Sequence, residues 1–358
     1  MDQHTEAALR MIGYTMRQIT DECLVAIRGG PAWTIDVAAR PVTVAPAAKR
    51  AGQLELHVEA ALIERFATRV SFRVIESWID SGRITVSGDQ ETVERFRRRM
   101  QAGGASSGLY AELAERIHDP RFVFMNHGFA ELDQDEDFHW LRPEDAPWRY
   151  SINLVRHLIE GLDLSGKRIL DVGCGRGGTC SYLRRYHEPA HVVGVDLVRG
   201  SIEFCRITHP LNGLEFIEGD AQNLPFEDAS FDVVTNIESS HCYPSLARFY
   251  AEVRRVLKPG GVFCYTDNMD PRLDNRHDEL LRAAGGTITA KRDITLEVAE
   301  GARRWQRLIG PDFMNEMINE DGSNAAFVAD LAGKLLTVDR VYQSGALVYH
   351  SWRVRFDP

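Results

Sequence analysis

Short apolar runs alternate with longer amphipathic stretches from about Tyr150 onward. Arg168–Val172 and the runs that resemble it have the length and β-branched content of buried strands; the others are His191–Asp196, Leu214–Glu218, Phe231–Asn236 and Val262–Thr266. Between the last two runs, apolar residues from Leu246 to Leu257 recur at helical spacing, and Pro259-Gly260-Gly261 ends that helix. This alternation predicts an α/β fold with a doubly wound parallel sheet.

The pattern changes after residue 270. Residues 276–333 look helical, and two strand-like runs follow, Leu335–Tyr342 and Ala346–Phe356. We expect these two runs to form an antiparallel hairpin at the sheet edge, completing a seven-stranded sheet. Residues 271–334 carry apolar positions at helical spacing, and we expect a helical lid over a large apolar pocket. Plain core packing against the sheet is the alternative.

The first part of the chain has a different pattern. Apolar residues alternate with polar ones in three places, which predicts short strands with one buried face: Leu54 to Val58, Val70 to Val74, and Ile84 to Val86. Asp89 is placed to cap a helix over about Gln90–Met100. We therefore expect a small α+β accessory domain over residues 1–105, which serves oligomerisation or docking. The stretch Gln101–Gly108 is rich in glycine and serine, which is typical of a linker. We end the accessory domain within this stretch and assign residues 106–149 to the linker and a helical cover. The main domain follows at residues 150–358.

Charge and composition narrow the function classes. The 358 residues carry a formal net charge of −10, and the sequence pI is about 5.7, which argues against nucleic acid as a partner. We interpret the basic cluster at Arg95 and residues 97–99 as a solvated helix face. No apolar run is long enough to span a bilayer, the N-terminus lacks a signal-peptide pattern, and the six cysteines form no CxxC pair. We expect a cytoplasmic protein that forms a homo-oligomer, a dimer or higher.

A glycine-rich turn carries the strongest chemical signal. Asp171-Val172-Gly173-Cys174-Gly175 leads from a buried strand through Gly178 into a helix. Glycines let the backbone take positive φ and approach a ligand closely, and a helix N-terminus offers unpaired N–H groups. Ligands of such sheets bind outside the carboxyl ends of the strands. The glycine spacing by itself also fits a dinucleotide-binding fold.

Three carboxylates favour a cationic nucleoside over a dinucleotide. Asp171 lies two residues before the first glycine, where it repels a pyrophosphate and suits a positively charged ligand. Asp196 ends the next strand, where a carboxylate can accept both ribose hydroxyls in either kind of cofactor. Asp220, with Ala221, follows the third strand and is placed to accept from an adenine amino group.

The ordered motifs resemble those of the class I S-adenosylmethionine methyltransferases. They are Asp171–Gly178, Val195-Asp196-Leu197, Gly219-Asp220-Ala221, Phe231-Asp232-Val233-Val234 and Leu257-Lys258-Pro259-Gly260-Gly261. A closer likeness, to the phthiotriol/phenolphthiotriol dimycocerosate methyltransferases and related natural-product enzymes, rests on Met125-Asn126-His127-Gly128, Tyr150-Ser151-Ile152 and Asn236–Pro244. The resemblance implies a Rossmann-like sheet, S-adenosylmethionine as cofactor and methyl transfer to a hydroxyl of a bulky, largely apolar small molecule. It implies cofactor contacts by Asp171, Gly173, Cys174, Gly175, Asp196, Leu197, Asp220, Ala221, Asn236 and Tyr150, although Tyr150 also suits the core.

His241 is the candidate catalytic base. It follows the fourth strand at the edge where the methyl acceptor is expected, and an imidazole titrates near neutral pH. Asp267 ends the fifth strand and is its candidate partner, and Glu238 is a third candidate that holds either the cofactor or the local backbone. A histidine that only bonds a loop is the alternative for His241. The dispersed histidines form no HxH or HExxH set, so no metal is expected.

Three competing functions remain open on the sequence. A carbon methyltransferase acting on a prenyl or aromatic carbon would use Glu238 to stabilise a cation. A nicotinamide-dependent oxidoreductase shares the doubly wound sheet, but Asp171 argues against it. A non-catalytic binding module that keeps the cofactor fold is the third, and the intact set of Asp171, Gly173, Gly175, Asp196 and Asp220 argues against it.

Overall fold

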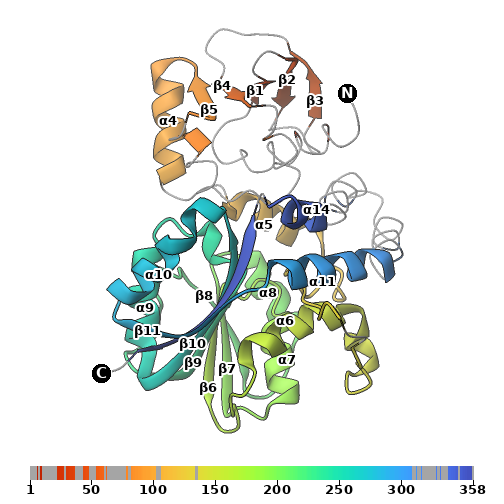
Figure 1. Ribbon diagram of the computed structural model, residues 1–358, viewed down its shortest axis with the longest axis vertical. Helices are drawn as coiled ribbons and strands as arrows, with labels where there is room; N and C mark the ends of the chain where they lie inside the picture. Colours follow the sequence, from red (N-terminus) through yellow and green to blue (C-terminus); the bar gives the residue numbers. More distant parts are fainter. Residues whose placement is uncertain are drawn as a thin grey trace. The chain divides into compact units, whose positions relative to one another are not determined.

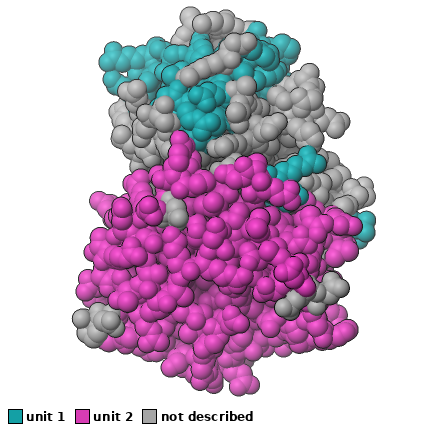
Figure 2. Space-filling view, viewed as in Figure 1, with its two compact units in different colours: residues 1–116, 310–341 teal, residues 117–309, 342–358 magenta. Residues whose placement is uncertain are grey.

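The computed structural model describes residues 22–27, 30–36, 43–47, 54–59, 82–101, 106–133, 136–308, 338–345 and 347–356, with a few isolated residues elsewhere. The chain divides into two compact units (Figure 2). The first contains residues 1–116 and 310–341, and the second contains residues 117–309 and 342–358. None of the described helices is both long and apolar enough to cross a bilayer.

A seven-stranded sheet forms the centre of the second unit (Figure 1). Its strands are β6 (Arg168–Val172), β7 (His191–Asp196), β8 (Leu214–Glu218), β9 (Phe231–Ile237), β10 (Leu257–Met269), β11 (Gly286–Asp293) and β12 (Val348–Phe356). Their order across the sheet is β11-β12-β10-β9-β6-β7-β8. The five strands from β10 to β8 are parallel, and β12 runs antiparallel to both β10 and β11. The predicted doubly wound, seven-stranded Rossmann-like sheet is confirmed.

Helices cover both faces of this sheet. They are α6 (Arg149–Ile159), α7 (Gly178–Tyr186), α8 (Arg199–Thr208), α9 (Leu246–Val256), α10 (Asp274–Ala283) and α11 (Thr295–Leu308), with short 3-10 turns η1 (Pro143–Trp148), η2 (Ser240–Cys242) and η3 (Pro271–Leu273). Figure 1 shows α9 and α10 on one side of the sheet and α6 and α7 on the other. Because both faces are covered, β6, β7 and β9 are nearly continuous runs of buried residues, as is typical of parallel strands.

The predicted C-terminal hairpin is wrong in its first strand. Val338–Gln343, which overlaps the run expected as Leu335–Tyr342, is the helix α14, and its buried Val338, Val341 and Tyr342 have helical spacing. The antiparallel partner of β12 is instead β11, which lies within residues 276–333 that were expected to be helical. Since β11 is an edge strand whose side chains are mostly exposed, its hydrophobic signal is weak.

The first unit contains a five-stranded mixed sheet in the order β3-β2-β1-β4-β5. Its strands are β1 (Glu22–Ile27), β2 (Ala32–Asp36), β3 (Thr43–Pro46), β4 (Leu54–Val58) and β5 (Ile84–Ser87). Two of the predicted strands are therefore present, and the predicted strand at residues 70–74 lies outside the described residues. The helix α4 (Gln90–Gln101) begins as expected, since the Asp89 carboxylate accepts from the Thr92 N–H at 2.8 Å.

The predicted linker is shorter than expected. The helix α5 (Ser106–Arg116) takes up the last three residues of the stretch 101–108, and residues 102–105 lie outside the described part of the chain. The side chains of the basic cluster at Arg95 and residues 97–99 also lie outside it, so that interpretation stays a prediction.

Candidate functional site

The glycine turn after β6 is held by hydrogen bonds from its own amides. Gly173 and Gly175 have φ of +71° and +52°, which a glycine adopts without strain. The N–H groups of Gly173 and Cys174 both donate to the Val195 carbonyl, at 2.8 and 3.0 Å, and the Gly175 N–H donates to Asp196 Oδ2 at 2.9 Å. These amides are therefore occupied by groups of the chain itself.

The start of α7 differs from the expected anion site. The Gly178 N–H donates to the Val123 carbonyl at 3.1 Å, so the expectation of an unpaired N–H group is wrong at this position. Arg176, between Gly175 and Gly177, is buried, and its guanidinium donates to the carbonyls of Phe122 and Asp119. A turn whose amides at Gly173, Cys174, Gly175 and Gly178 already donate to the chain itself is poorly suited to a phosphate.

The candidate carboxylates lie in different environments. Asp171 is 2% exposed, and its oxygens accept from the Thr235 hydroxyl at 2.7 Å and from the Cys180 thiol at 3.4 Å. Burial raises the pKa of Asp171 to about 7. The carboxylate of Asp171 is therefore directed into the protein interior beside the glycine turn, where it contacts Thr235 and Cys180.

Asp196 and Asp220 lie at the adjacent strand ends. Asp196 is partly buried, and burial raises its pKa although it accepts from the backbone N–H groups of Val198 and Gly175. Asp220 is partly exposed and accepts from the Gln222 N–H at 2.8 Å. Leu197, directly after Asp196, is 59% exposed, whereas Ala221 is buried. This edge thus offers carboxylate oxygens beside an open apolar surface.

A polar cluster lies against the glycine turn at the end of β9. Asn236 Nδ2 shares its two hydrogens among three acceptors, the Val172 carbonyl at 2.8 Å, Ser239 Oγ at 2.7 Å and the Tyr243 hydroxyl at 3.0 Å. A Cβ atom on Gly173 would lie 2.3 Å from Ser239 Oγ, so the glycine is required by this close approach. Asn236 Oδ1 is buried and has no hydrogen-bond partner among the described residues.

The segment Val123–Phe129, which precedes α6 and is called the covering segment below, packs against the glycine turn. The Met125 methyl carbon lies so close to Gly175 that a Cβ atom there would be 2.3 Å from it. Tyr150 is buried at the start of α6, where its ring packs edge-on against Phe138 and its carbonyl accepts from the Phe129 N–H at 2.9 Å. The structure thus gives Tyr150 a packing role, whereas Val123, Phe124 and Met125 contact the turn.

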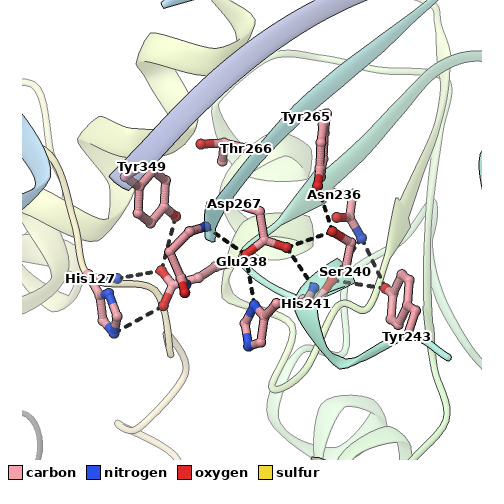
Figure 3. A network of polar contacts seen from close by, with 12 residues as sticks. His127, Asn236, Glu238, Ser240, His241, Tyr243, Tyr265, Thr266, Asp267 and Tyr349 are labelled. Atoms are coloured by element: carbon pink, nitrogen blue, oxygen red, sulfur yellow. Dashed lines mark hydrogen bonds and ion pairs between the residues drawn. The ribbon is translucent and has the colours of Figure 1, made fainter. Parts of the chain in front are cut away.

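His241 and Asp267 form a buried pair at the carboxyl ends of β9 and β10 (Figure 3). His241 Nδ1 lies 2.7 Å from Asp267 Oδ1, and the His241 N–H donates to Asp267 Oδ2 at 2.8 Å. His241 is 7% exposed and Asp267 is fully buried. Figure 3 shows the second ring nitrogen of His241, Nε2, on the side away from Asp267.

The pair is polarised towards imidazolium and carboxylate. Burial alone lowers the pKa of His241, but its interactions with Cys242 and Asp267 outweigh burial and raise that pKa well above its usual value. Burial raises the pKa of Asp267, but the attraction of His241 outweighs it, and the pKa lies below its usual value. A raised histidine pKa makes this imidazole a stronger base when it is unprotonated.

Glu238 is fully engaged with the covering segment. Its Oε2 accepts from the His127 N–H at 2.9 Å and from the Tyr349 hydroxyl at 3.0 Å, and its Oε1 lies 3.0 Å from His127 Nε2 (Figure 3). His127 Nδ1 lies 2.7 Å from the Tyr342 hydroxyl. Glu238 also has a φ of +53°, a strained backbone for a residue with a Cβ atom. Glu238 therefore ties the end of β9 to the segment that covers the glycine turn.

Several residues of this site were not among the sequence candidates. His127 was visible only as part of the motif Met125-Asn126-His127-Gly128, and no spacing pointed from it to Glu238, which lies 111 positions later. Ser240, Tyr265 and Tyr349 carry no pattern that separates them from core residues.

Comparisons with known proteins identify the family to which these motifs belong. The sequence model of a methyltransferase domain matches residues 170–265. The fatty-acid O-methyltransferase of Mycolicibacterium smegmatis is 44% identical over 197 residues, which cover 55% of this chain and 71% of that protein. The phthiotriol/phenolphthiotriol dimycocerosates methyltransferase of Mycobacterium tuberculosis is 47% identical over 192 residues, covering 54% of this chain and 70% of that protein.

Solved structures share the fold. The geranyl diphosphate C-methyltransferase of Streptomyces coelicolor superposes with a TM-score of 0.51 at 16% identity, over 69% of this chain and 97% of that one. At this identity, the similarity shows the fold of the second unit's sheet and not its reaction.

Proposed function

We propose, because the chain belongs to the S-adenosylmethionine-dependent methyltransferases, that it transfers a methyl group to an oxygen of a bulky, largely apolar acceptor. The observation that carries the proposal is the buried His241–Asp267 pair at the edge of the sheet where Asn236 and the glycine turn lie. Both relatives described above have names that point to apolar acceptors, and one is named for oxygen methylation.

The residues around the turn fit this cofactor. When bound, S-adenosylmethionine supplies an electrophilic methyl group on a positively charged sulfur. Asn236 Oδ1, a buried acceptor without a donor among the described residues, suits an ammonium or hydroxyl group of such a ligand. Asp196 and Asp220 would accept from ribose hydroxyls and an adenine amino group, and exposed Leu197 would cover an apolar ring face.

His241 has the geometry of a general base. Its Nδ1–H is held by Asp267 Oδ1, which leaves Nε2 to accept the proton of an acceptor hydroxyl. Asp267 then stabilises the imidazolium that forms, since its carboxylate is buried and lies 2.7 Å away. Deprotonation makes the acceptor oxygen a better nucleophile, and base catalysis of this kind contributes about 100–10,000-fold to a rate.

The geometry favours oxygen over carbon as the acceptor atom. Stabilising a carbocation would require a carboxylate that faces the acceptor, and Glu238 was the candidate. Its carboxylate is 1% exposed, and both of its oxygens are engaged by His127 and Tyr349. A proton-accepting histidine, in contrast, is useful for a hydroxyl and has no proton to remove from an alkene before methylation.

The lid over the acceptor stays a prediction. Within residues 271–334, α10 packs against α9 and β11, and β11 is itself a strand of the sheet, so a lid is confined to residues after 293. The helix α11 exposes Leu296 and Leu308, which suits contact with an apolar acceptor.

The test uses purified protein, methyl-labelled S-adenosylmethionine and matched acceptors. Long-chain alcohols, phenols and fatty acids are compared with their O-methylated forms and with prenyl compounds that lack a hydroxyl. We expect label in an O-methyl group of the free hydroxyl or carboxyl compounds only, identified by mass spectrometry and NMR. Label on a carbon atom, or equal labelling of the blocked compounds, would overturn the proposal.

A further inference from the structure

The hydrogen bonds of Asp267 continue beyond His241 into the core of the second unit. Asp267 Oδ2 accepts from the Ser240 hydroxyl at 2.6 Å. Ser240 Oγ lies 2.6 Å from the Tyr265 hydroxyl, which lies 2.9 Å from His277 Nδ1 on α10 (Figure 3 for the first two contacts). Ser240 and Tyr265 are fully buried, and His277 is nearly so.

The direction of every bond in this chain follows from the number of protons available. An ionised Asp267 can only accept, so Ser240 donates its single proton to it. Tyr265 must then donate its own proton to Ser240. Because Tyr265 has no second proton, the contact with His277 requires a hydrogen on Nδ1 that is donated to the tyrosine oxygen.

A second tyrosine lies at the same nitrogen. The Tyr250 hydroxyl also lies 2.9 Å from His277 Nδ1, so one N–H group faces two phenol oxygens. The His277 ring stacks on Tyr265 and on Trp352, with centroids 5.9 and 5.5 Å away, which fixes its orientation. The ring is therefore held with Nδ1 towards the hydroxyl groups of Tyr265 and Tyr250.

We propose that Ser240, Tyr265 and His277 are positioning residues that keep Asp267 ionised and thereby set the proton affinity of the His241 base. This role deepens the proposed oxygen methylation and rests on it for its catalytic consequence. Asp267 receives two backbone donors as well, from His241 and Asn268, but those bonds do not depend on any side chain. Ser240 is thus the side-chain donor through which distant residues reach the carboxylate.

The physical effect has a definite sign. The Ser240 hydroxyl stabilises the carboxylate most when His241 is neutral, since an imidazolium compensates that charge directly. Loss of the hydroxyl therefore favours the imidazolium and raises the pKa of His241 further. We expect an upward shift of about one pH unit for Ser240→Ala, equivalent to roughly tenfold in proton affinity. The shifts for Tyr265→Phe and His277→Phe have the same sign and are smaller, because they act through Ser240.

Other titratable groups near His241 and Asp267 also affect the pKa of His241, so a comparison of variants has to leave these groups in place. They belong to the turn η2, the end of β9, α10 and β12, and comprise Cys242, Glu238, His277, Tyr349 and His350. Ser240→Ala replaces none of these five side chains and reaches His277 only through Tyr265, which makes it the most informative variant. Tyr182→Phe is the matched control, because it removes one buried hydroxyl from α7, where that hydroxyl contacts His187.

The experiment is NMR of the full chain with ¹⁵N-labelled histidine, titrated with pH. Signals are assigned with His241→Gln and His277→Phe. The proposal predicts a hydrogen on His277 Nδ1 in the wild-type protein and an upward shift of the His241 midpoint in the order Ser240→Ala, Tyr265→Phe, His277→Phe, with no shift in Tyr182→Phe. A bare Nδ1 on His277, unchanged midpoints or downward shifts would overturn it.

Two features keep this test independent of variant stability and of the proposed function. The protonation of His277 is measured in the wild-type protein, so a variant that fails to fold does not remove the test. The titration of His241 requires no substrate, so a protein that methylates no oxygen would refute the proposed function and leave the predicted shifts to be measured separately.

Discussion

Replacing Gly173 by alanine tests whether the glycine turn is shaped by the polar cluster at the end of β9. The glycine has a φ of +71°, and an added Cβ atom would lie 2.3 Å from Ser239 Oγ and 2.6 Å from the Tyr243 hydroxyl. Neither distance is tolerable for a carbon atom, so Ser239 and Tyr243 would have to move away from Asn236.

The expected loss of stability has two parts. A left-handed backbone costs an L-residue about 1–2 kcal/mol. Displacing Ser239 breaks its hydrogen bonds to Asn236 and Tyr243, at about 0.5–1.5 kcal/mol each. The sum is about 2–5 kcal/mol. Gly260 provides a matched control, because its φ is +75° and an added Cβ atom there would meet nothing within 4 Å, leaving only the backbone part.

Urea unfolding gives the stability of both variants, and calorimetry gives their affinity for S-adenosylhomocysteine. We expect Gly173→Ala to lose more stability than Gly260→Ala and to bind the nucleoside at least tenfold more weakly, while Gly260→Ala binds it normally. Equal losses of stability together with wild-type affinity in Gly173→Ala would refute the reasoning, because the polar cluster would then be unconnected to the site.

Three further predictions follow from the buried polar groups. Burial raises the pKa of Asp171 to about 7 from 3.8, so the folded state binds more protons than the unfolded state between these pH values. As pH rises from about 4 to 7, the free energy of unfolding of the wild type should therefore fall by about 4 kcal/mol relative to that of Asp171→Asn. A difference between the two proteins that does not change with pH in urea unfolding would contradict this. His127→Asn should raise the KM for S-adenosylmethionine several-fold with a smaller change in kcat, because it removes the ring contacts to Glu238 and Tyr342 and so loosens the segment that places Met125 on the turn; steady-state kinetics that show an effect on kcat alone would argue against that role. Since the pKa of His241 is raised and only the neutral ring accepts a proton, kcat should rise with pH through a midpoint well above 6.5, and a pH-independent kcat would count against His241 as the base.

The sequence predicts the sheet of the second unit well and its C-terminal edge poorly. Strands such as His191–Asp196 are buried on both faces, so their apolar runs are nearly continuous and easy to recognise. The edge strand Gly286–Asp293 has mostly exposed side chains and gives no such signal. Val338–Gln343 contains β-branched and aromatic residues, which favour a strand, whereas their spacing places them on one face of a helix.

The candidate site is predictable where it consists of strand ends and unpredictable where distant segments meet. Asp196 ends β7, and Asp267 directly follows Thr266, the last residue of β10 that pairs with β9, so the topology alone places both at one edge of the sheet. The role of Asp171 was less predictable, because whether a carboxylate faces a ligand or the core depends on its neighbours, here Thr235 and Cys180. The contact of Glu238 with His127 joins segments 111 positions apart, and no local pattern encodes it.

Single-turnover methyl transfer by His241→Gln measures the contribution of the base most directly. The variant is mixed with labelled S-adenosylmethionine and an oxygen acceptor identified with the wild-type enzyme, and its affinity for S-adenosylhomocysteine is measured in parallel. We expect a rate lower by about 100–10,000-fold with unchanged affinity for the nucleoside. A rate within a few-fold of the wild type, in a variant that binds the nucleoside normally, would contradict it.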